Sequence, residues 1–137
     1  MLMDTGGNSG SQASVTIIRA LSLGEVDLKD IFKVLWKEIR VGILCGASLA
    51  VINFAKIWLV DKLLLGTSGI TVTVDLVINL TLFVEIIFAK IVGCTLPIFA
   101  KKLKFDPAVM SSPFITTIID ALSLLIYFGL ATAILHI

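Results

Sequence analysis

Three long apolar stretches, separated by polar segments, dominate the chain. They occupy residues 41–60, 70–99 and 112–137, the last being apolar from residue 114 onwards. Each reaches the length of roughly 20 residues that a helix needs to cross the hydrocarbon core of a bilayer. Only helices and closed barrels satisfy every backbone amide in lipid. Because the stretches are continuous and do not alternate, we predict an all-α integral membrane protein with three full transmembrane helices.

The amino-terminal segment, residues 1–25, has a mixed pattern. Glycines and small polar residues dominate its first half, a composition that by itself favours a flexible tail. Gly6 and Gly10, however, have the four-residue spacing that lets membrane helices pack closely. The following residues are apolar until Gly24, a typical helix stop. We therefore expect residues 1–25 to form a partial helix whose polar side chains could line an aqueous path.

Residues 26–40 have a third pattern, in which apolar and charged positions alternate with helical spacing. One face carries Leu28, Ile31, Phe32, Leu35 and Ile39, and the charged residues lie elsewhere. This pattern predicts an amphipathic helix at the membrane interface. Trp36 suits the level of the lipid headgroups.

The composition agrees with a membrane protein. Hydrophobic residues make up 58% of the chain and the mean hydropathy is +1.07, whereas soluble domains average about 45–50% apolar residues. A net charge of +1 gives no reason to expect a nucleic-acid partner. Cys45 and Cys94 lie in apolar runs, and we interpret them as packing residues. The first residues lack the basic region and apolar core of a cleavable signal peptide.

The distribution of basic residues predicts how the chain is oriented. Lysine and arginine gather in residues 26–40 and 100–107, whereas the loop at 61–69 carries a single lysine beside Asp61. By the positive-inside rule, both basic segments face the cytoplasm. A multi-pass protein of the plasma membrane with its carboxy terminus outside is the predicted arrangement. His136 then lies at an outer end, with no role assigned to it.

Asp120 is the only formally charged residue in the last apolar stretch. A charged side chain at the centre of a bilayer costs on the order of 3 kcal/mol on insertion scales, so such a residue is a functional candidate by default. Thr116, Ser123 and Tyr127 have the spacing that puts them on the same helical face as Asp120. The alternative is that Asp120 is buried against a neighbouring helix for structural reasons alone.

Glu85 is a second acid inside an apolar stretch, and Lys90 follows five residues later. Charged residues pair on a helix at a spacing of three or four, so no salt bridge between these two is predicted. A structural polar contact and a supporting functional role are both open for Glu85. In the same stretch, Pro97 predicts that the helix ends or kinks.

An intramembrane carboxylate can bind a cation, relay a proton or form half of an aspartic-protease pair. Hard divalent cations prefer oxygen ligands, and Mg²⁺ keeps several of its waters, so its site needs few direct protein ligands. Groups of this kind are present in Asp120, Thr116, Ser123, Asn8, Ser11 and Gln12. No thiolate–imidazole cluster points to a softer metal.

Several motifs resemble one known family. Residues 3–14 read MDTGGNSGSQAS and residues 19–25 read RALSLGE, and both resemble the second transmembrane helix of the MgtE magnesium channels. Later motifs similar to the same family are Gly93 with Leu96–Pro97, Asp106–Pro107–Ala108, Ser112–Pro113–Phe114, Thr116–Thr117 and Asp120. The resemblance covers essentially the whole chain. It corresponds to the carboxy-terminal part of the family's membrane domain, from within the second helix through the fifth.

The resemblance implies a homodimer in which the second and fifth helices line a pore along the two-fold axis. It implies that Asp120 binds hydrated Mg²⁺, the transported ion, which flows down its electrochemical gradient. The other expected pathway residues are Asp4, Gly7, Asn8, Ser11, Gln12, Thr116 and Ser123, with Glu85 and Tyr127 as supporting polar residues. Ser11 departs from the family pattern, which often has asparagine at this position.

The resemblance also implies that the family's first helix and its regulatory cytoplasmic domains lie outside this sequence. Two alternatives to a homodimeric channel therefore stay open. One is an assembly subunit that completes a pore with a second membrane subunit. The other is an intramembrane aspartyl protease that would use Asp4 and Asp120. Because Ile119 and Ala121 flank Asp120 where that class has a glycine-flanked signature, we expect no enzymatic activity.

Overall fold

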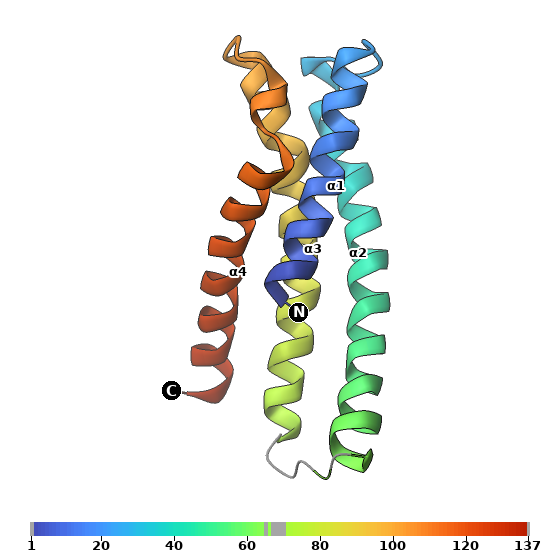
Figure 1. Ribbon diagram of the computed structural model, residues 1–137, viewed down its shortest axis with the longest axis vertical. Helices are drawn as coiled ribbons and strands as arrows, with labels where there is room; N and C mark the ends of the chain where they lie inside the picture. Colours follow the sequence, from blue (N-terminus) through green and yellow to red (C-terminus); the bar gives the residue numbers. More distant parts are fainter. Residues whose placement is uncertain (1, 65, 67–70, 137) are drawn as a thin grey trace.

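The chain folds into a bundle of long helices in the computed structural model (Figure 1). The structure describes residues 2–64, 66 and 71–136, without the side chains of residues 61 and 62. The long helices are α1 (Leu2–Ser22), α2 (Ile31–Lys56), α3 (Val72–Lys102) and α4 (Ser112–Leu135). Shorter helical turns are η1 (Leu28–Asp30), η2 (Ile57–Leu64) and η3 (Pro107–Val109). No strand occurs within these described ranges, and the predicted all-α fold is confirmed.

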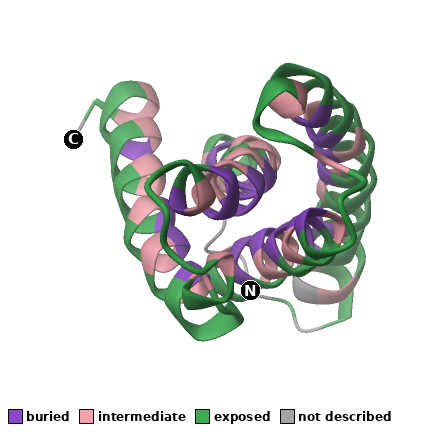
Figure 2. Cartoon of the chain, turned by 90° about the horizontal axis from the view of Figure 1, so that it is seen from above, coloured by how far each residue is buried: buried purple, intermediate pink, exposed green. Residues whose placement is uncertain are grey.

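Helix α3 is the centre of the bundle. It packs against α1, α2 and α4, and α1 also packs against α4. One apolar cluster joins α3 to α1 and α2 through Ile17, Leu21, Val34, Cys94 and Ile98, and a second joins it to α4 through Ala89, Ile115 and Ile119. Seen along the bundle, buried residues gather where the helices meet and exposed residues face outward (Figure 2). Cys94 is therefore a packing residue, as predicted, but Cys45 is exposed and the prediction is wrong for it.

Three helical segments are long and apolar enough to cross a membrane. They are Leu28–Val60, Val72–Lys102 and Ser112–Leu135, which confirms the predicted number of spans in the described part of the chain. The first differs from the expected arrangement, because residues 31–56 form one continuous helix without a break near residue 40. No proline lies near residue 40. The two nearby glycines, Gly42 and Gly46, are within the helix and pack against α3, so they do not end it. The interfacial position of the helix start stays a prediction.

The helix ends depend on local backbone chemistry. After α1, Gly24 has a φ of +71°, and the Glu25 amide donates to the Ala20 carbonyl at 3.0 Å, so the predicted stop is confirmed. Pro97 lies inside α3, which continues to Lys102, so of the two predicted outcomes the helix does not end at this proline, and a kink stays a prediction. Proline removes only one backbone donor, and the buried packing around α3 keeps the helix continuous. In the expected loop at 61–69, η2 extends to Leu64, and residues 65 and 67–70 lie outside the described residues.

The glycine-rich segment forms helix α1, which packs closely against α3. The backbone of Gly10 contacts Gly93 of α3 so closely that a Cβ atom on Gly93 would overlap it. A Cβ atom on Gly10 would itself lie 2.9 Å from the Ala89 carbonyl oxygen. These contacts are possible only between residues without side chains. The segment is thus a packed helix, and the flexible tail that its composition favours is not what forms.

Candidate ion pathway

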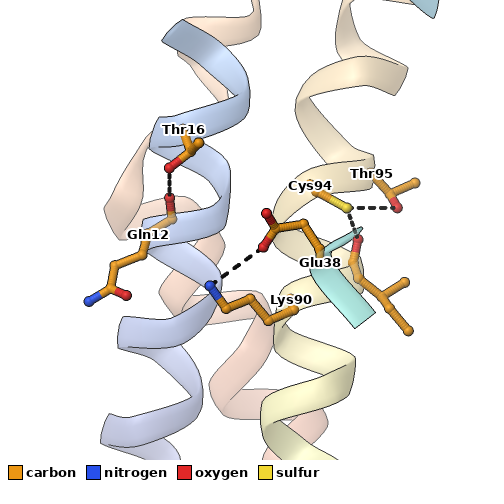
Figure 3. Close-up of polar contacts among 7 residues, drawn as sticks. Gln12, Thr16, Glu38, Lys90, Cys94 and Thr95 are labelled. Atoms are coloured by element: carbon orange, nitrogen blue, oxygen red, sulfur yellow. Dashed lines mark hydrogen bonds and ion pairs between the residues drawn. The ribbon is translucent and has the colours of Figure 1, made fainter. Parts of the chain in front are cut away.

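Helix α1 carries a polar stripe on its exposed side. Asp4, Asn8, Gln12 and Thr16 follow one another at intervals of four residues, and all four are exposed. The Asn8 amide donates to Asp4 Oδ1 at 3.4 Å. Figure 3 shows the second bond of the stripe, in which the Thr16 hydroxyl donates to the Gln12 carbonyl at 2.8 Å. Polar groups that face hydrocarbon without partners are costly. The stripe therefore suits water or another polar surface better than lipid.

Hydroxyl groups join α1 to α4 beside this stripe. Ser11 Oγ lies 3.0 Å from Thr116 Oγ1, whose own hydroxyl donates to the Ser112 carbonyl at 2.8 Å. One turn further along α1, Ser14 Oγ donates to the Met110 carbonyl at 2.9 Å. Two predicted pathway residues from distant parts of the chain, Ser11 and Thr116, are thus brought into contact.

An open groove runs over this junction. It has a volume of about 550 Å³ and is lined by Asn8, Ser11, Gln12, Val15, Thr16 and Ser112. Its lining contains amide and hydroxyl groups that can both donate and accept hydrogen bonds. Such a lining fits water or the hydration shell of an ion.

Asp120 lies at the inner edge of the same junction, against Gly7 of α1. A Cβ atom on Gly7 would lie 2.9 Å from Thr116 Cγ2 and 3.5 Å from Asp120 Oδ1. Asp120 is half-buried, and its Oδ1 atom is buried without a hydrogen-bond partner among the described residues. A carboxylate in this state is available to a cation, because no basic side chain in the described structure neutralises it.

Ser123 and Glu85 lie together inside the bundle. Ser123 is only 2% exposed, and its Oγ lies 2.5 Å from Glu85 Oε1 and 2.8 Å from the Ile119 carbonyl oxygen. Glu85 is 1% exposed, so a polar contact between α3 and α4 is what the structure shows for it. Tyr127 packs edge-on against Phe128, with ring centroids 5.5 Å apart. The four polar residues expected on one face of α4 therefore lie against different parts of the bundle. These residues are Thr116, Asp120, Ser123 and Tyr127.

A buried ion pair joins α2 to α3, and the sequence did not predict it. Lys90 Nζ lies 3.5 Å from Glu38 Oε2 (Figure 3). Lys90 also lines a cavity of about 250 Å³ together with Asn8 and Gln12 of α1. A lysine in an apolar run requires a polar partner, and this requirement is the feature of the sequence that indicates an ion pair at Lys90. The partner could not be identified, because Glu38 lies 52 positions earlier on a helix whose charged face was expected to be solvated.

A second polar network joins α2 and α3 towards the other end of the bundle. The Asn53 side-chain amide donates to Asn79 Oδ1 at 3.2 Å, and the Asn79 amide donates to Asp75 Oδ1 at 2.6 Å. All three residues are buried. Their polar atoms are paired with one another, as buried polar groups usually are.

Long apolar helices that carry a polar stripe and an unpaired intramembrane carboxylate define a class of protein, the α-helical membrane transporters and channels. The comparison with protein families makes the class specific. The model of the MgtE family, described as a divalent cation transporter, matches residues 1–130, and the chain belongs to this family.

Curated relatives agree with this assignment. The chain is 38% identical over 134 residues to the magnesium transporter MgtE of Bacillus subtilis, covering 95% of this chain and 27% of the relative. It is 37% identical over 137 residues to the magnesium transporter MgtE of Thermus thermophilus, covering 99% of this chain and 28% of the relative. These relatives are named as transporters and not as proteases, which favours the transporter class. The chain thus spans little more than a quarter of their length.

Proposed function

We propose that the chain forms the ion-conducting membrane part of a Mg²⁺ transporter. Hydrated Mg²⁺ passes down its electrochemical gradient through a pore between two copies of the chain, lined by α1 and α4. The observation that supports this best is the Asp120 carboxylate of α4, whose Oδ1 atom has no hydrogen-bond partner among the described residues and lies against Gly7, next to Asn8 of the α1 polar stripe. The names of the relatives support Mg²⁺ as the ion.

The chemistry of the lining fits an ion that keeps its water. Mg²⁺ dehydrates reluctantly and is held by one or two carboxylates with several waters in place. One Asp120 from each copy supplies two negative charges, which match the charge of the ion. Gly7 has no side chain, which lets Thr116 and Asp120 of α4 lie directly against α1. Asn8, Ser11 and Gln12 then hydrogen-bond the water of the ion and not the ion itself.

The pairing of two copies follows from where the polar groups lie. Asp4, Asn8 and Gln12 are exposed on the outside of a single chain, and in lipid this arrangement costs free energy. A second copy facing the same stripe encloses water between the two surfaces and removes this cost. Other exposed residues of the long helices include Leu44, Leu125 and Phe128, whose apolar side chains suit lipid.

The driving force follows from the predicted orientation. With the basic segments on the cytoplasmic side of the plasma membrane, the membrane potential draws cations inward. A divalent ion gains about 4.6 kcal/mol per 100 mV, twice the value for a single charge. No coupled ion is needed for net uptake at this driving force.

Mg²⁺ flux into liposomes tests the proposal. The purified chain is reconstituted, and the flux is compared with that of Asp120→Ala at equal protein content. We expect flux for the unsubstituted chain and none for the variant. Flux that appears only when a longer family member is reconstituted with the chain would instead support an assembly subunit. Equal flux for both proteins would reject Asp120 as the ion-binding residue.

A further inference from the structure

Glu85 has an unusual environment for an acid in a membrane helix. Its side chain is 1% exposed, and its Oε2 atom is buried without a hydrogen-bond partner among the described residues. Lys90, the nearest basic residue along α3, pairs with Glu38 of α2 instead. An ionised carboxylate here would keep a full charge in the interior of the bundle with no counter-charge in contact among the described residues, which is among the costliest states for a side chain.

A second carboxylate makes this state still less favourable. Asp120 of α4 lies against the same stretch of α1 as Glu85. The two acids face adjacent glycines of α1, Glu85 against Gly6 and Asp120 against Gly7. Two negative charges near each other in a low dielectric repel strongly, and sites of this kind commonly keep one of the two acids protonated.

The hydrogen bonds around Ser123 indicate where a proton fits. Ser123 Oγ lies within hydrogen-bond distance of both Glu85 Oε1 and the Ile119 carbonyl, but a hydroxyl has one hydrogen to donate. If that hydrogen goes to Ile119, the contact with Glu85 needs a hydrogen on the Glu85 carboxyl. A protonated Glu85 then donates to Ser123, which donates to Ile119, and the chain of donors is complete. The Oε2 atom is left as a neutral carbonyl oxygen, whose burial costs far less than that of a charge.

We propose that Glu85 is a neutral carboxylic acid, a proton-binding site inside the membrane, and that its hydrogen bond to Ser123 positions α4. Ser123 lies one helical turn after Asp120, so this bond sets the rotation of the helix segment that carries the ion-binding carboxylate. With Glu85 neutral, Asp120 keeps the only negative charge of the pair for the cation. Glu85 is a positioning residue in this arrangement and does not contact the ion. The inference about position rests on the proposed function, whereas the inference about the proton does not.

Replacement by glutamine tests the neutral state. Glu85→Gln keeps the shape, has no charge and can still donate a hydrogen bond to Ser123 Oγ. We expect its Mg²⁺ flux to stay within about twofold of the unsubstituted chain, whereas Glu85→Met, which cannot donate, loses about tenfold, the usual scale for one buried hydrogen bond. Loss of flux in a folded Glu85→Gln protein would show that the charge is needed and would overturn the proposal.

Infrared spectroscopy gives a readout that does not depend on transport. A protonated carboxyl group has a C=O stretching band distinct from that of a carboxylate. At neutral pH in lipid, we expect the difference spectrum between the unsubstituted chain and Glu85→Gln to show the loss of one such band. Glu38→Gln is the matched control, because the Glu38 carboxylate is paired with Lys90 and its replacement removes no protonated band.

The two readouts separate the two proposals. If Asp120→Ala conducts normally but the Glu85 band is present, the assignment of Asp120 fails and the proton site stands. If no protonated band is lost in Glu85→Gln, Glu85 is ionised and the inference fails, whatever the flux of the Asp120 variant.

Discussion

Polar side chains lie among apolar helices in two places, the interface between α2 and α3 and the junction between α1 and α4. The two places differ in whether these polar groups are paired. At the first, Glu38 pairs with Lys90, and Asn53 pairs with Asn79. At the second, Ser11 and Thr116 form one hydroxyl contact, while the Asp120 carboxylate is left with an unpartnered oxygen. Half of the most apolar stretch of α3 is buried, against 17% in α4 and 17% in the segment that contains α2, so α3 is the most buried of the three spans.

We interpret the α2–α3 interface as structural and the α1–α4 junction as the part that binds the ion. Paired polar groups between α2 and α3 hold the two helices in one register. The unpaired carboxylate at the α1–α4 junction costs free energy that packing elsewhere must offset. A cation supplied from outside the chain can recover that cost. The comparison therefore predicts which substitutions change transport and which change stability.

The largest expected effect is on transport. Asp120→Asn keeps the size of the side chain and removes its charge, so Mg²⁺ uptake should fall to background while the helical content stays unchanged. Asp106→Asn is the control, because Asp106 caps η3 through its Oδ1 atom and asparagine caps equally well. Complementation of a magnesium-dependent strain measures both. Growth of the Asp120→Asn strain equal to that of the control would contradict the assignment.

The next largest effect is on stability. Glu38→Ala leaves Lys90 buried without its carboxylate partner, and breaking a buried ion pair typically costs about 3–5 kcal/mol. The free energy of unfolding in detergent or lipid should fall by that amount. Replacing both residues together, Glu38→Met with Lys90→Met, should recover most of the loss, because no unpaired charge is left. A double variant as unstable as Glu38→Ala would argue against the ion pair as the cause.

Close packing of α1 on α3 should give a smaller but clear effect. Gly93→Ala places a methyl group against the Gly10 backbone, and overpacking of this kind costs about 1–3 kcal/mol. Gly129→Ala is the matched control, since nothing lies within 4 Å of a Cβ atom at that position of α4. Thermal unfolding should show a lower melting temperature for Gly93→Ala than for Gly129→Ala. Equal melting temperatures would mean that α1 is not packed on α3 in the membrane.

The smallest effect concerns the hydroxyl contact between α1 and α4. Ser11→Ala removes the bond to Thr116, worth about 1 kcal/mol, and should lower Mg²⁺ flux a few-fold without changing the fold. Ser48→Ala removes a hydroxyl that bonds only within its own helix, to the Leu44 carbonyl at 2.8 Å, and serves as control. Flux measured in liposomes should separate the two variants. An equal loss in both would point to a general effect of removing hydroxyls.

Local sequence pattern was sufficient for much of the fold. Continuous apolar runs predict the spans, since their length is set by the bilayer and not by neighbours. Gly24 predicts the end of α1, because glycine readily adopts the positive φ that ends a helix there. The pattern left open whether the helix ends or kinks at Pro97, and it divided the chain near residue 40, whereas packing against neighbouring helices keeps α3 and α2 continuous at both places.

The candidate site was predictable only in its parts. Asp120, Ser11 and Thr116 are recognisable as polar residues in apolar surroundings, and the motifs of the family identify them as a set. Helical periodicity places Ser123 near the face of Asp120, but it cannot show that Ser123 turns inward to Glu85 while Asp120 lies against Gly7. The direction of a side chain depends on which helix lies beside it.

Composition and periodicity alone therefore determined that this is an all-α membrane protein with an acid in its last span. Only the tertiary structure decided which acid is paired, which is left unpaired and which meets a serine. The reason is that helix formation depends on residues a few positions apart, whereas the partner of a buried charge is chosen by packing between helices. Glu38 and Lys90, or Glu85 and Ser123, are too far apart in the chain for any local rule to connect them.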